Sequence, residues 1–279
     1  INAYEISKRI AQKGISIDII TRDIGSDNLK LPKNLNVIKI GAKTTAFNAL
    51  SKIIFLVRCF FYIYFNSYDL VHAHAFLPGI TARLLMVFKG IPAVFTVHGT
   101  SIGTSLLNPL FRLIEKFILT EILYSAQITV SQDFLKLKNI NKKVVYIPNG
   151  VDVKRFDKES PRKFKYPTLI FVGRLHQQKN LLTLILAVEK VSQDHPDIKL
   201  EIVGDGSQKA MLREEVKNLK LMKFIRFHGK VTGRNLIKLY KSCYIFILPS
   251  LYEGQPLTLL EAWGAKLHVI VDRSGDCQF

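Results

Sequence analysis

The sequence has few cysteines and no apolar run long enough to cross a membrane. Its three cysteines, Cys59, Cys243 and Cys277, lie far apart and form no CxxC pair. This spacing excludes a disulfide framework and a thiolate metal site, and it is typical of a reducing compartment. One apolar segment, IIFLVRCFFYIYF at 53–65, is interrupted by Arg58. A spanning helix needs roughly 20 apolar residues, so we expect a buried or interfacial helix there.

Acidic residues are also scarce. The chain has 22 of them against 40 basic residues, which gives a formal net charge of +18. This charge is spread over both halves of the sequence. This charge favours phosphates, acidic lipid surfaces or nucleic acid as partners, without choosing among them. The sequence has no nucleic-acid recognition motif and no interleaving of aromatic and basic residues on a strand, so we expect no nucleic-acid partner. Hydrophobic residues make up 48% of the chain, which excludes a disordered protein.

Short β-branched runs alternate with helical patterns along the whole chain. Strands are predicted at 15–21, 36–40, 69–74, 92–98, 127–130, 143–148, 168–173, 199–204, 224–229, 244–249 and 267–271. Helices are predicted at 2–13, 46–66, 78–89, 108–124, 180–193, 207–219, 233–241 and 256–264. This alternation predicts an α/β fold with parallel sheets that helices cover on both faces.

A stretch rich in charge, proline and glycine at 147–167 is typical of a linker. We therefore predict two Rossmann-like domains, residues 1–152 and residues 153–279. Parallel sheets bind ligands beyond the carboxyl ends of their strands. The residues that follow each predicted strand are thus the candidates for chemistry.

Two strand ends in the second half carry glycine and charge. After strand 168–173, Gly173 allows a close backbone approach, Arg174 offers a two-pronged donor, and Lys179 precedes a helix. Two cations beside a helix N-terminus suit a diphosphate, although two solvated cations in a loop are the alternative. After strand 199–204, the GDG sequence that begins at Gly204 predicts a tight turn, which by itself indicates no ligand.

A third strand end, LPSLYEGQPLTLLEAWGAK at 248–266, combines a helix start with two carboxylates. We predict that Pro256 takes the first helical position, where its missing N–H costs little. The free N–H groups of Leu257, Thr258 and Leu259 would then form a donor-rich end suited to a phosphate.

The two carboxylates of this stretch, Glu253 and Glu261, lie before and inside the predicted helix. They would bracket a ligand bound at the helix end, and carboxylates accept hydrogen bonds from sugar hydroxyls. The expected ligand is a diphosphate with a sugar at each end, which is a nucleotide sugar. In the alternative, Glu253 caps the helix and Glu261 lies on a solvated face.

Several motifs together resemble one family. FVGRLHQQKN, IPNGVD, LEIVGDG, IRFHGKV and LPSLYEGQPLTLLEAWGAK resemble the C-terminal domain of family-4 retaining glycosyltransferases, the glycosyl transferases group 1 of the GT-B fold. The spacing of Glu253 and Glu261 matches that family's signature. In the first half, YEISKRIAQKGISIDIITR, YDLVHAHAF, FTVHGT and TVSQDF fit as well. The resemblance covers nearly the whole chain.

The resemblance also implies which parts are missing. The family's first strand and glycine-rich loop would precede residue 1, and a segment that crosses back to the first domain would follow residue 279. Together with an opening helix pattern that has no initiator Met, this leads us to expect a fragment truncated at both ends.

The resemblance implies a site between two domains whose sheets face a central cleft. Arg174 and Lys179 would neutralise the donor diphosphate, Glu261 would hold the ribose, and Glu253 would touch the transferred sugar. The implied donor-binding set is Gly173, Arg174, Lys179, Gly204, Gly229, Val231, Glu253, Gly254, Pro256, Leu257, Thr258 and Glu261. Within it, the backbone amides of Leu257 and Thr258 would meet the phosphates, and the backbone of 229–231 would lie beside the base.

The implied catalytic set adds a histidine from the first domain. It consists of Glu253, His98, Arg174 and Lys179, with His98 facing the reacting sugar and His74 lining the cleft. His72 and His74 share one face of a strand, as metal ligands could. The family usually works without a metal. We therefore predict no metal and no cofactor, with a nucleotide-diphosphate sugar as donor substrate.

The resemblance implies a retaining, hexosyltransferase-like enzyme. It would transfer a sugar to an acceptor hydroxyl on a glycan or a lipid-linked sugar, in glycan, polysaccharide or glycolipid synthesis. We expect a cytoplasmic location, or the inner face of the membrane with peripheral contact to anionic lipid. The alternatives are an inactive nucleotide-sugar-binding fragment and an epimerase or phosphorylase of the same fold.

Overall fold

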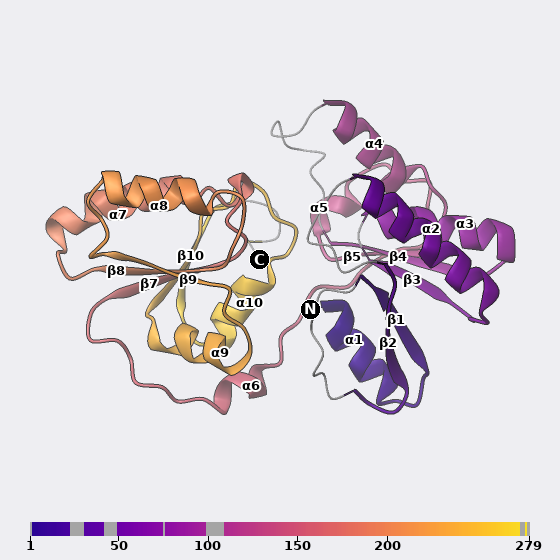
Figure 1. Cartoon of the computed structure of the whole chain (residues 1–279), viewed down its shortest axis with the longest axis horizontal. Helices are drawn as coiled ribbons and strands as arrows, with labels where there is room; N and C mark the ends of the chain where they lie inside the picture. The colour runs from indigo at the N-terminus through magenta and orange to yellow at the C-terminus, as the bar shows by residue number, and fades with distance from the viewer. Residues whose placement is uncertain are drawn as a thin grey trace. The chain divides into compact units, whose positions relative to one another are not determined.

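The computed structural model describes residues 2–22, 31–41, 49–74, 76–98, 109–273 and 277. The chain folds into two compact units (Figure 1). Unit 1 consists of Ile1–Val130 and Phe134–Ile147, and unit 2 of Ser131–Asp133 and Pro148–Phe279. The sequence-based boundary, after residue 152, lies in the same stretch of chain.

Unit 1 contains two parallel sheets. Its elements are α1 (Asn2–Ala11), β1 (Ile17–Thr21), β2 (Leu35–Lys39), α2 (Ala49–Phe65), β3 (Val71–His74), α3 (Phe76–Lys89), β4 (Ala93–Val97), α4 (Pro109–Thr120), β5 (Ala126–Thr129) and β6 (Val144–Tyr146). Within the described residues, β1 pairs with β2, and a second sheet has the order β3-β4-β5-β6. Helix α1 packs on the first sheet and α3 on β3 and β4. The short α5 (Gln132–Leu135) spans the division between the units.

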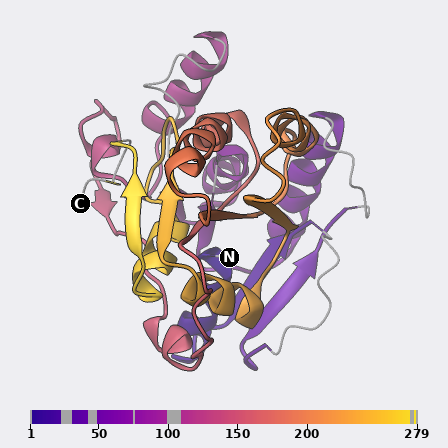
Figure 2. The same ribbon diagram turned by 90° about the vertical axis from the view of Figure 1, so that its left-hand side faces the viewer.

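Unit 2 is built on one parallel sheet with the order β11-β10-β7-β8-β9. Its elements are α6 (Val153–Asp157), β7 (Thr168–Val172), the 3-10 helix η1 (Gln177–Lys179), α7 (Leu181–Asp194), β8 (Lys199–Val203), α8 (Lys209–Asn218), β9 (Ile225–Gly229), α9 (Gly233–Ser242), β10 (Ile245–Leu248), α10 (Leu257–Gly264) and β11 (His268–Val271). Helices α7 and α8 cover one face of the sheet, and α9 and α10 cover the other (Figures 1 and 2).

The strands of unit 2 are apolar because both faces of the sheet are covered. All five residues of β7 are buried, and its apolar residues belong to one large core. The parallel register pairs Val172 of β7 with Val203 of β8, and Val203 with Gly229 of β9. Three neighbouring strands therefore end side by side, and the loops that follow them meet at the carboxyl-terminal end of the sheet.

The α/β class with parallel sheets in both halves is confirmed, and each predicted strand is found with ends shifted by at most a few residues. The stretch 147–167, predicted as a linker, also contains α6, a helix that was not predicted. That helix is hard to predict because only Phe156 of its five residues is buried. Its ring packs where Gly264 of α10 has no side chain, which fixes α6 against α10.

The apolar segment 53–65 lies within α2. Among the described residues, no helix has both the length and the apolar content needed to cross a membrane.

Candidate functional site

The loops after β7 and β8 pack backbone against backbone, and this contact requires glycine. A Cβ on Gly204, whose φ is +141°, would lie 1.8 Å from the carbonyl oxygen of Gly173. A Cβ on Gly206 would lie 2.4 Å from the carbonyl oxygen of Leu175. The N–H of Gly204 also donates to the carbonyl of Gly229, at 2.8 Å. Three glycines of the predicted donor-binding set are thereby brought together at one sheet edge.

The loop after β7 is fastened to the loop before α10. The Gln178 side-chain amide donates to the Tyr252 carbonyl at 2.8 Å, and the Leu251 N–H donates to the Gln178 carbonyl at 2.9 Å. Beside these bonds, the Lys179 ammonium forms an ion pair with the Glu253 carboxylate. The two side chains are only 12% and 9% exposed. Two predicted catalytic residues that lie far apart in the sequence are therefore in direct contact.

Arg174, the other predicted cation, stands apart from this pair. It follows Gly173 at the end of β7, and its side chain is exposed. An exposed guanidinium keeps its fork of donors open to an incoming anion. The candidate site thus contains one cation, Lys179, that is paired with a carboxylate and a second, Arg174, that is exposed to solvent.

Helix α10 begins one residue later than predicted. Pro256 is its N-cap, with φ −73° and ψ 121°, so the prediction of Pro256 at the first helical position is wrong. The Leu259 N–H donates to the Pro256 carbonyl at 3.2 Å and is not free, contrary to the prediction. The N–H groups of Leu257 and Thr258 keep no partner within the helix, as helix geometry requires. These two amides give the helix end its positive character.

A second strap holds the same loop from the side of the IPNG motif. The Asn149 side-chain amide donates to the Gln255 carbonyl at 2.8 Å, and the Asn149 N–H bonds to the Gln255 side-chain oxygen. These bonds fix the short segment that carries Glu253 and Gly254 ahead of the helix. Sequence reasoning gave neither Asn149 nor Gln255 this role, because they lie 106 positions apart.

Glu261 is half-buried inside α10, which disfavours the solvated-face alternative. The fully buried Tyr240 of α9 donates its hydroxyl to Glu261 Oε2 at 3.0 Å. Burial raises the pKa of Glu261, while the Tyr240 hydrogen bond and the charge of Arg155 oppose that rise. Burial and the Glu261 charge in turn raise the pKa of Tyr240, which stays a neutral donor. Tyr240 looks like any core aromatic in the helical pattern, so no signal in the sequence marked it.

The end of β9 is held by a further polar pair. His228 bonds to the carboxylate of Glu201, a mostly buried residue of β8. Gly229 follows with φ +69°, and Val231 packs partly buried against the core of unit 2. The predicted base-binding segment therefore starts from a fixed point beside the other two strand ends.

The two predicted histidines of unit 1 also meet. His74 Nδ1 lies 2.9 Å from His98 Nε2, a distance at which one ring donates and the other accepts. The His72 ring lies 4.2 Å from that of His74, and its Nε2 lies 2.7 Å from the Thr96 hydroxyl. Burial lowers the pKa of His74 to about 3 and also lowers the pKa values of His72 and His98. All three rings are therefore neutral at pH 7.

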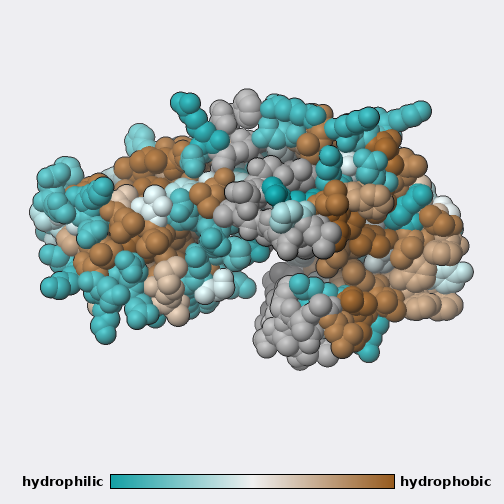
Figure 3. All heavy atoms as spheres, turned by 90° about the horizontal axis from the view of Figure 1, so that it is seen from above, coloured by the Kyte–Doolittle hydropathy of each residue, from teal (hydrophilic) through white to brown (hydrophobic). Residues whose placement is uncertain are grey.

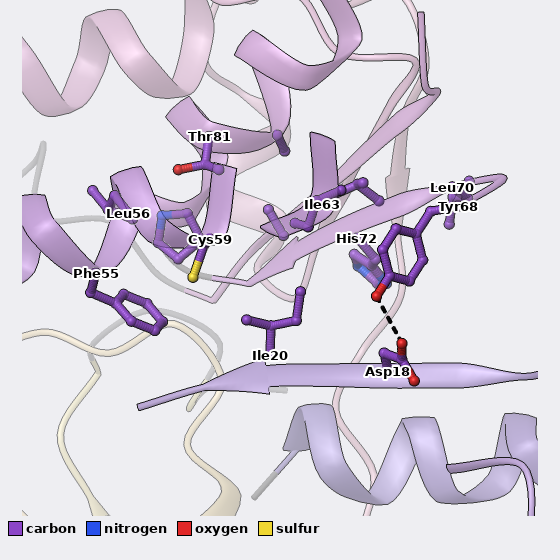
Figure 4. Close-up of a pocket in the computed structure, with 14 residues that line it drawn as sticks. Asp18, Ile20, Phe55, Leu56, Cys59, Ile63, Tyr68, Leu70, His72 and Thr81 are labelled. Atoms are coloured by element: carbon purple, nitrogen blue, oxygen red, sulfur yellow. Dashed lines mark hydrogen bonds between the residues drawn. The ribbon is translucent and has the colours of Figure 1, made fainter. Parts of the chain in front are cut away.

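Unit 1 also contains a pocket of about 150 Å³ beside this cluster (Figure 4). Asp18 of β1 and Tyr68 point toward one another, with the hydroxyl 2.7 Å from the carboxylate, while apolar side chains such as Ile63 line the pocket together with His72 and Thr81. Asn36 donates to the other Asp18 oxygen at 2.9 Å.

Within the described ranges, no three His, Cys, Asp or Glu side chains are placed to hold a metal ion. The three cysteines are buried and form no disulfide. The expectations that His98 faces the reacting sugar and that His74 lines a cleft stay predictions.

Comparison with protein families gives two adjoining matches. The family described as Glycosyltransferase Family 4 matches residues 2–155, more than half of the chain. The family described as Glycosyl transferases group 1 matches residues 152–277.

Individual proteins give the same picture. The chain is similar to glycogen synthase from Mycobacterium tuberculosis, 27% identical over 217 residues, covering 74% of this chain and 52% of that protein. It is also similar to the UDP-Gal:alpha-D-GlcNAc-diphosphoundecaprenol alpha-1,3-galactosyltransferase of Escherichia coli, 32% identical over 233 residues, covering 74% of this chain and 58% of that protein. The chain thus spans about half the length of these curated relatives.

Among solved structures, sucrose-phosphate synthase from Thermosynechococcus elongatus superposes with a TM-score of 0.83 at 19% identity, covering 99% of this chain and 76% of that chain. At this identity the likeness concerns the fold alone. It confirms the predicted GT-B-like fold class.

Proposed function

The chain belongs to Glycosyltransferase Family 4, and from that premise we propose that it transfers a sugar from a nucleotide-diphosphate sugar to an acceptor hydroxyl with retention. One observation carries the proposal. The Lys179–Glu253 ion pair lies in the loops beside the start of α10, and Glu261 lies inside that helix on Tyr240. Cation, carboxylate and helix end are the groups that a sugar diphosphate needs.

We place the donor diphosphate at the N-terminus of α10. The N–H groups of Leu257 and Thr258 would donate to phosphate oxygens, and the exposed Arg174 would close over them. Negative charge grows on the diphosphate as it leaves the sugar. Preorganised donors aimed at that charge stabilise the transition state more than the ground state.

In this proposal Lys179 serves two partners. It holds the Glu253 carboxylate, and its remaining N–H donors would reach a phosphate oxygen. Glu253 would then lie beside the sugar carbon from which the diphosphate departs. Positive charge develops on that sugar, and a carboxylate next to it favours the transition state. The ion pair fixes the position of the Glu253 carboxylate for this task.

Glu261 would hold the nucleoside end of the donor. Tyr240 bonds to its Oε2, and its other oxygen would accept hydrogen bonds from ribose hydroxyls. These bonds exist before and during the reaction, so they contribute to donor binding more than to the chemical step. Gly229 and Val231 would lie beside the base.

Retention rests on the family resemblance. With no general base among the proposed residues, we infer that an oxygen of the donor phosphate takes the proton from the acceptor hydroxyl. The chain's own residues would then contribute positioning and electrostatic stabilisation.

We propose a glycan or a lipid-linked sugar as acceptor, in polysaccharide or glycolipid synthesis. The name of the Escherichia coli relative specifies a UDP-galactose donor and a diphosphoundecaprenol-linked acceptor, which supports this class. A cytoplasmic protein in peripheral contact with the inner face of the membrane would meet both substrates.

A panel of sugar nucleotides tests this function. The full chain is incubated with each donor, with and without simple glycoside acceptors, and nucleoside diphosphate release is measured beside chromatography of the sugar nucleotides. We expect release from one donor, rising with acceptor and lost in Glu253→Gln. Interconversion of two sugar nucleotides without release would indicate an epimerase instead. Tighter binding of an oligonucleotide than of any sugar nucleotide at physiological salt would contradict the proposal.

A further inference from the structure

Helix α2 is apolar on two faces. Buried Cys59 and Ile63 face the interior of unit 1. On the opposite side a stripe of exposed apolar residues follows helical spacing. Together with exposed apolar residues of α3 it forms the α2–α3 face, made of Leu50, Ile53, Ile54, Val57, Phe61, Tyr64, Phe65, Leu84, Val87 and Phe88.

The α2–α3 face is continuous across the two helices. They pack against each other, and the Phe60 ring of α2 meets the Phe88 ring of α3 edge to face, with centroids 6.3 Å apart. Along α2, Phe61 stacks on Phe65 with centroids 6.2 Å apart. Phe65 is 77% exposed and Phe88 is 65% exposed. Figure 3 shows apolar residues gathered into a broad area on unit 1, the right-hand part of that view.

Charge on these helices has one sign. Helix α2 carries Lys52 and Arg58, α3 carries Arg83 and Lys89, and neither helix contains an acidic residue. Arg58 is exposed next to Val57 of the apolar stripe. Lys89 donates to the Ile63 carbonyl at 3.2 Å and so places a cation at the C-terminal end of α2. Exposed aromatic and aliphatic groups between cations are typical of helices that lie in a membrane interface.

We propose that the α2–α3 face docks on an anionic phospholipid surface, with α2 lying along the bilayer. At 1.5 Å per residue its 17 residues extend about 25 Å, and its exposed stripe would enter the boundary between headgroups and acyl chains. The basic residues would remain among the headgroups, where each one adds to binding of acidic lipid.

The charge pattern favours lipid over a second copy of the chain as the occupant. A symmetric dimer would place the same face on itself. Arg58 and the other cations of one copy would then meet only the cations of the other, with no acidic residue on either helix to pair them. An anionic bilayer supplies the opposite charge together with the apolar phase.

The biological role of this docking rests on the proposed function, because docking would bring the enzyme to a lipid-linked acceptor. Docking by itself needs no donor. Vesicle binding and nucleotide binding are therefore measured on the same variants, and each can fail without the other.

Cosedimentation of the full chain with vesicles tests the proposal. We expect binding to phosphatidylglycerol vesicles at low salt, weaker binding at high salt, and little binding to phosphatidylcholine vesicles. The double variant Phe61→Ser, Phe65→Ser should bind phosphatidylglycerol at least about tenfold more weakly, because it removes two large groups from the bilayer. Both side chains are exposed, so the fold has no need of them.

Matched variants on unit 2 give the control. Leu182 and Leu186 of α7 are each 39% exposed, and their spacing is that of Phe61 and Phe65. Leu182→Ser, Leu186→Ser should leave vesicle binding unchanged. For charge, Arg58→Glu should weaken phosphatidylglycerol binding by about fivefold or more, whereas Lys190→Glu on the exposed side of α7 should have less than half that effect.

Three results would overturn the proposal. They are equal vesicle binding by the wild-type chain and Phe61→Ser, Phe65→Ser, equal binding to neutral and anionic vesicles, or a dimer in solution that the same double variant dissolves. Binding of each nucleoside diphosphate of the donor panel, measured by calorimetry, should be the same for that variant and the wild-type chain. If none of them binds either protein while vesicle binding follows the expectation, the proposed donor site fails and the docking surface stands.

Discussion

The two units use their apolar side chains differently. In unit 2, the helices direct their buried residues at one sheet, and the described core residues form a single large cluster. In unit 1, the described core residues form two smaller clusters, while α2 and α3 expose a continuous apolar face. Charge differs as well. Unit 2 holds a mostly buried ion pair at its strand ends, whereas unit 1 holds three neutral histidines.

This difference separates a precise site from an adaptable surface. At the strand ends of unit 2, backbone contacts through Gly204 and two straps of hydrogen bonds fix Lys179 and Glu253. Such positioning suits electrostatic catalysis, where small displacements are costly. The exposed apolar residues of unit 1 do not need to be positioned as accurately, and this suits contact with a fluid surface.

The largest effect is expected where backbone meets backbone. Gly204→Ala places a Cβ 1.8 Å from the Gly173 carbonyl oxygen at a φ of +141°, so the strand ends must separate. We expect the free energy of unfolding to fall by more than about 4 kcal/mol, measured by urea denaturation. Gly150→Ala, whose added Cβ meets no atom within 4 Å, should change it by about 0.5 kcal/mol at most. Equal stability of the two variants would show that the close approach is absent in solution.

The next effect concerns the buried ion pair. Lys179→Ala removes a cation from the proposed phosphate site and leaves the mostly buried Glu253 carboxylate without this partner. We expect kcat/KM to fall about 100-fold, the loss typical of one preorganised donor. Lys238 lies 3.9 Å from Glu159 and is 52% exposed, so Lys238→Ala should change kcat/KM less than about twofold. If kcat/KM fell by a similar factor in both variants, the Lys179–Glu253 pair would have no specific role in catalysis.

The histidines of unit 1 predict a pH dependence of stability. Burial lowers the pKa of His74 to about 3, so the folded chain keeps this ring neutral while the unfolded chain takes up a proton below about pH 6.5. The free energy of unfolding should therefore decrease as the pH falls from 7 to 5. We expect His74→Gln to remove about 1–2 kcal/mol of that decrease, measured by urea denaturation at each pH. His195→Gln, at an exposed position, should keep the wild-type dependence of stability on pH. If His74→Gln also kept it, burial of His74 would not be the cause of the decrease.

The smallest effect is expected on the α2–α3 face. Phe65→Ser should change the free energy of unfolding by less than about 0.5 kcal/mol, because the ring is 77% exposed. Phe246→Ser in the fully buried core of unit 2 should cost about 3 kcal/mol or more. If Phe65→Ser destabilised the chain by a similar amount, the face would be part of a core and the comparison between the units would fail.

Much of the fold could be predicted from the sequence, because alternating strand and helix patterns are local signals. The strands from Ile17 to Val271 and the long helices follow from them. Helix α6 was missed because its charged segment has no apolar period. For α2 the sequence left a buried and an interfacial helix open, since a helix that is apolar on two faces gives no clear hydrophobic side.

For the candidate site, the sequence pointed to residues that the structure brings together, but it did not predict their contacts. Glycines after strands and a Pro256 helix start are local patterns that point to the sheet edge. The pairing of Lys179 with Glu253 spans 74 positions, and that of Tyr240 with Glu261 links two helices. Contacts of this kind depend on the register of β7 and β10 and on how α9 packs beside α10. No spacing rule encodes them.

The orientation of the donor is the central claim, and calorimetry with the nucleoside diphosphate of the active donor, beside steady-state rates, tests it most directly. Glu261 should bind the nucleoside end, so Glu261→Gln should weaken binding of that nucleoside diphosphate by about tenfold, the loss of one hydrogen bond to a charged group. Glu253 should act at the sugar, so Glu253→Gln should lower kcat by at least about 100-fold and leave nucleoside diphosphate binding within about twofold of the wild-type chain. If Glu253→Gln abolished nucleoside diphosphate binding while Glu261→Gln left it intact, the donor would lie the other way round.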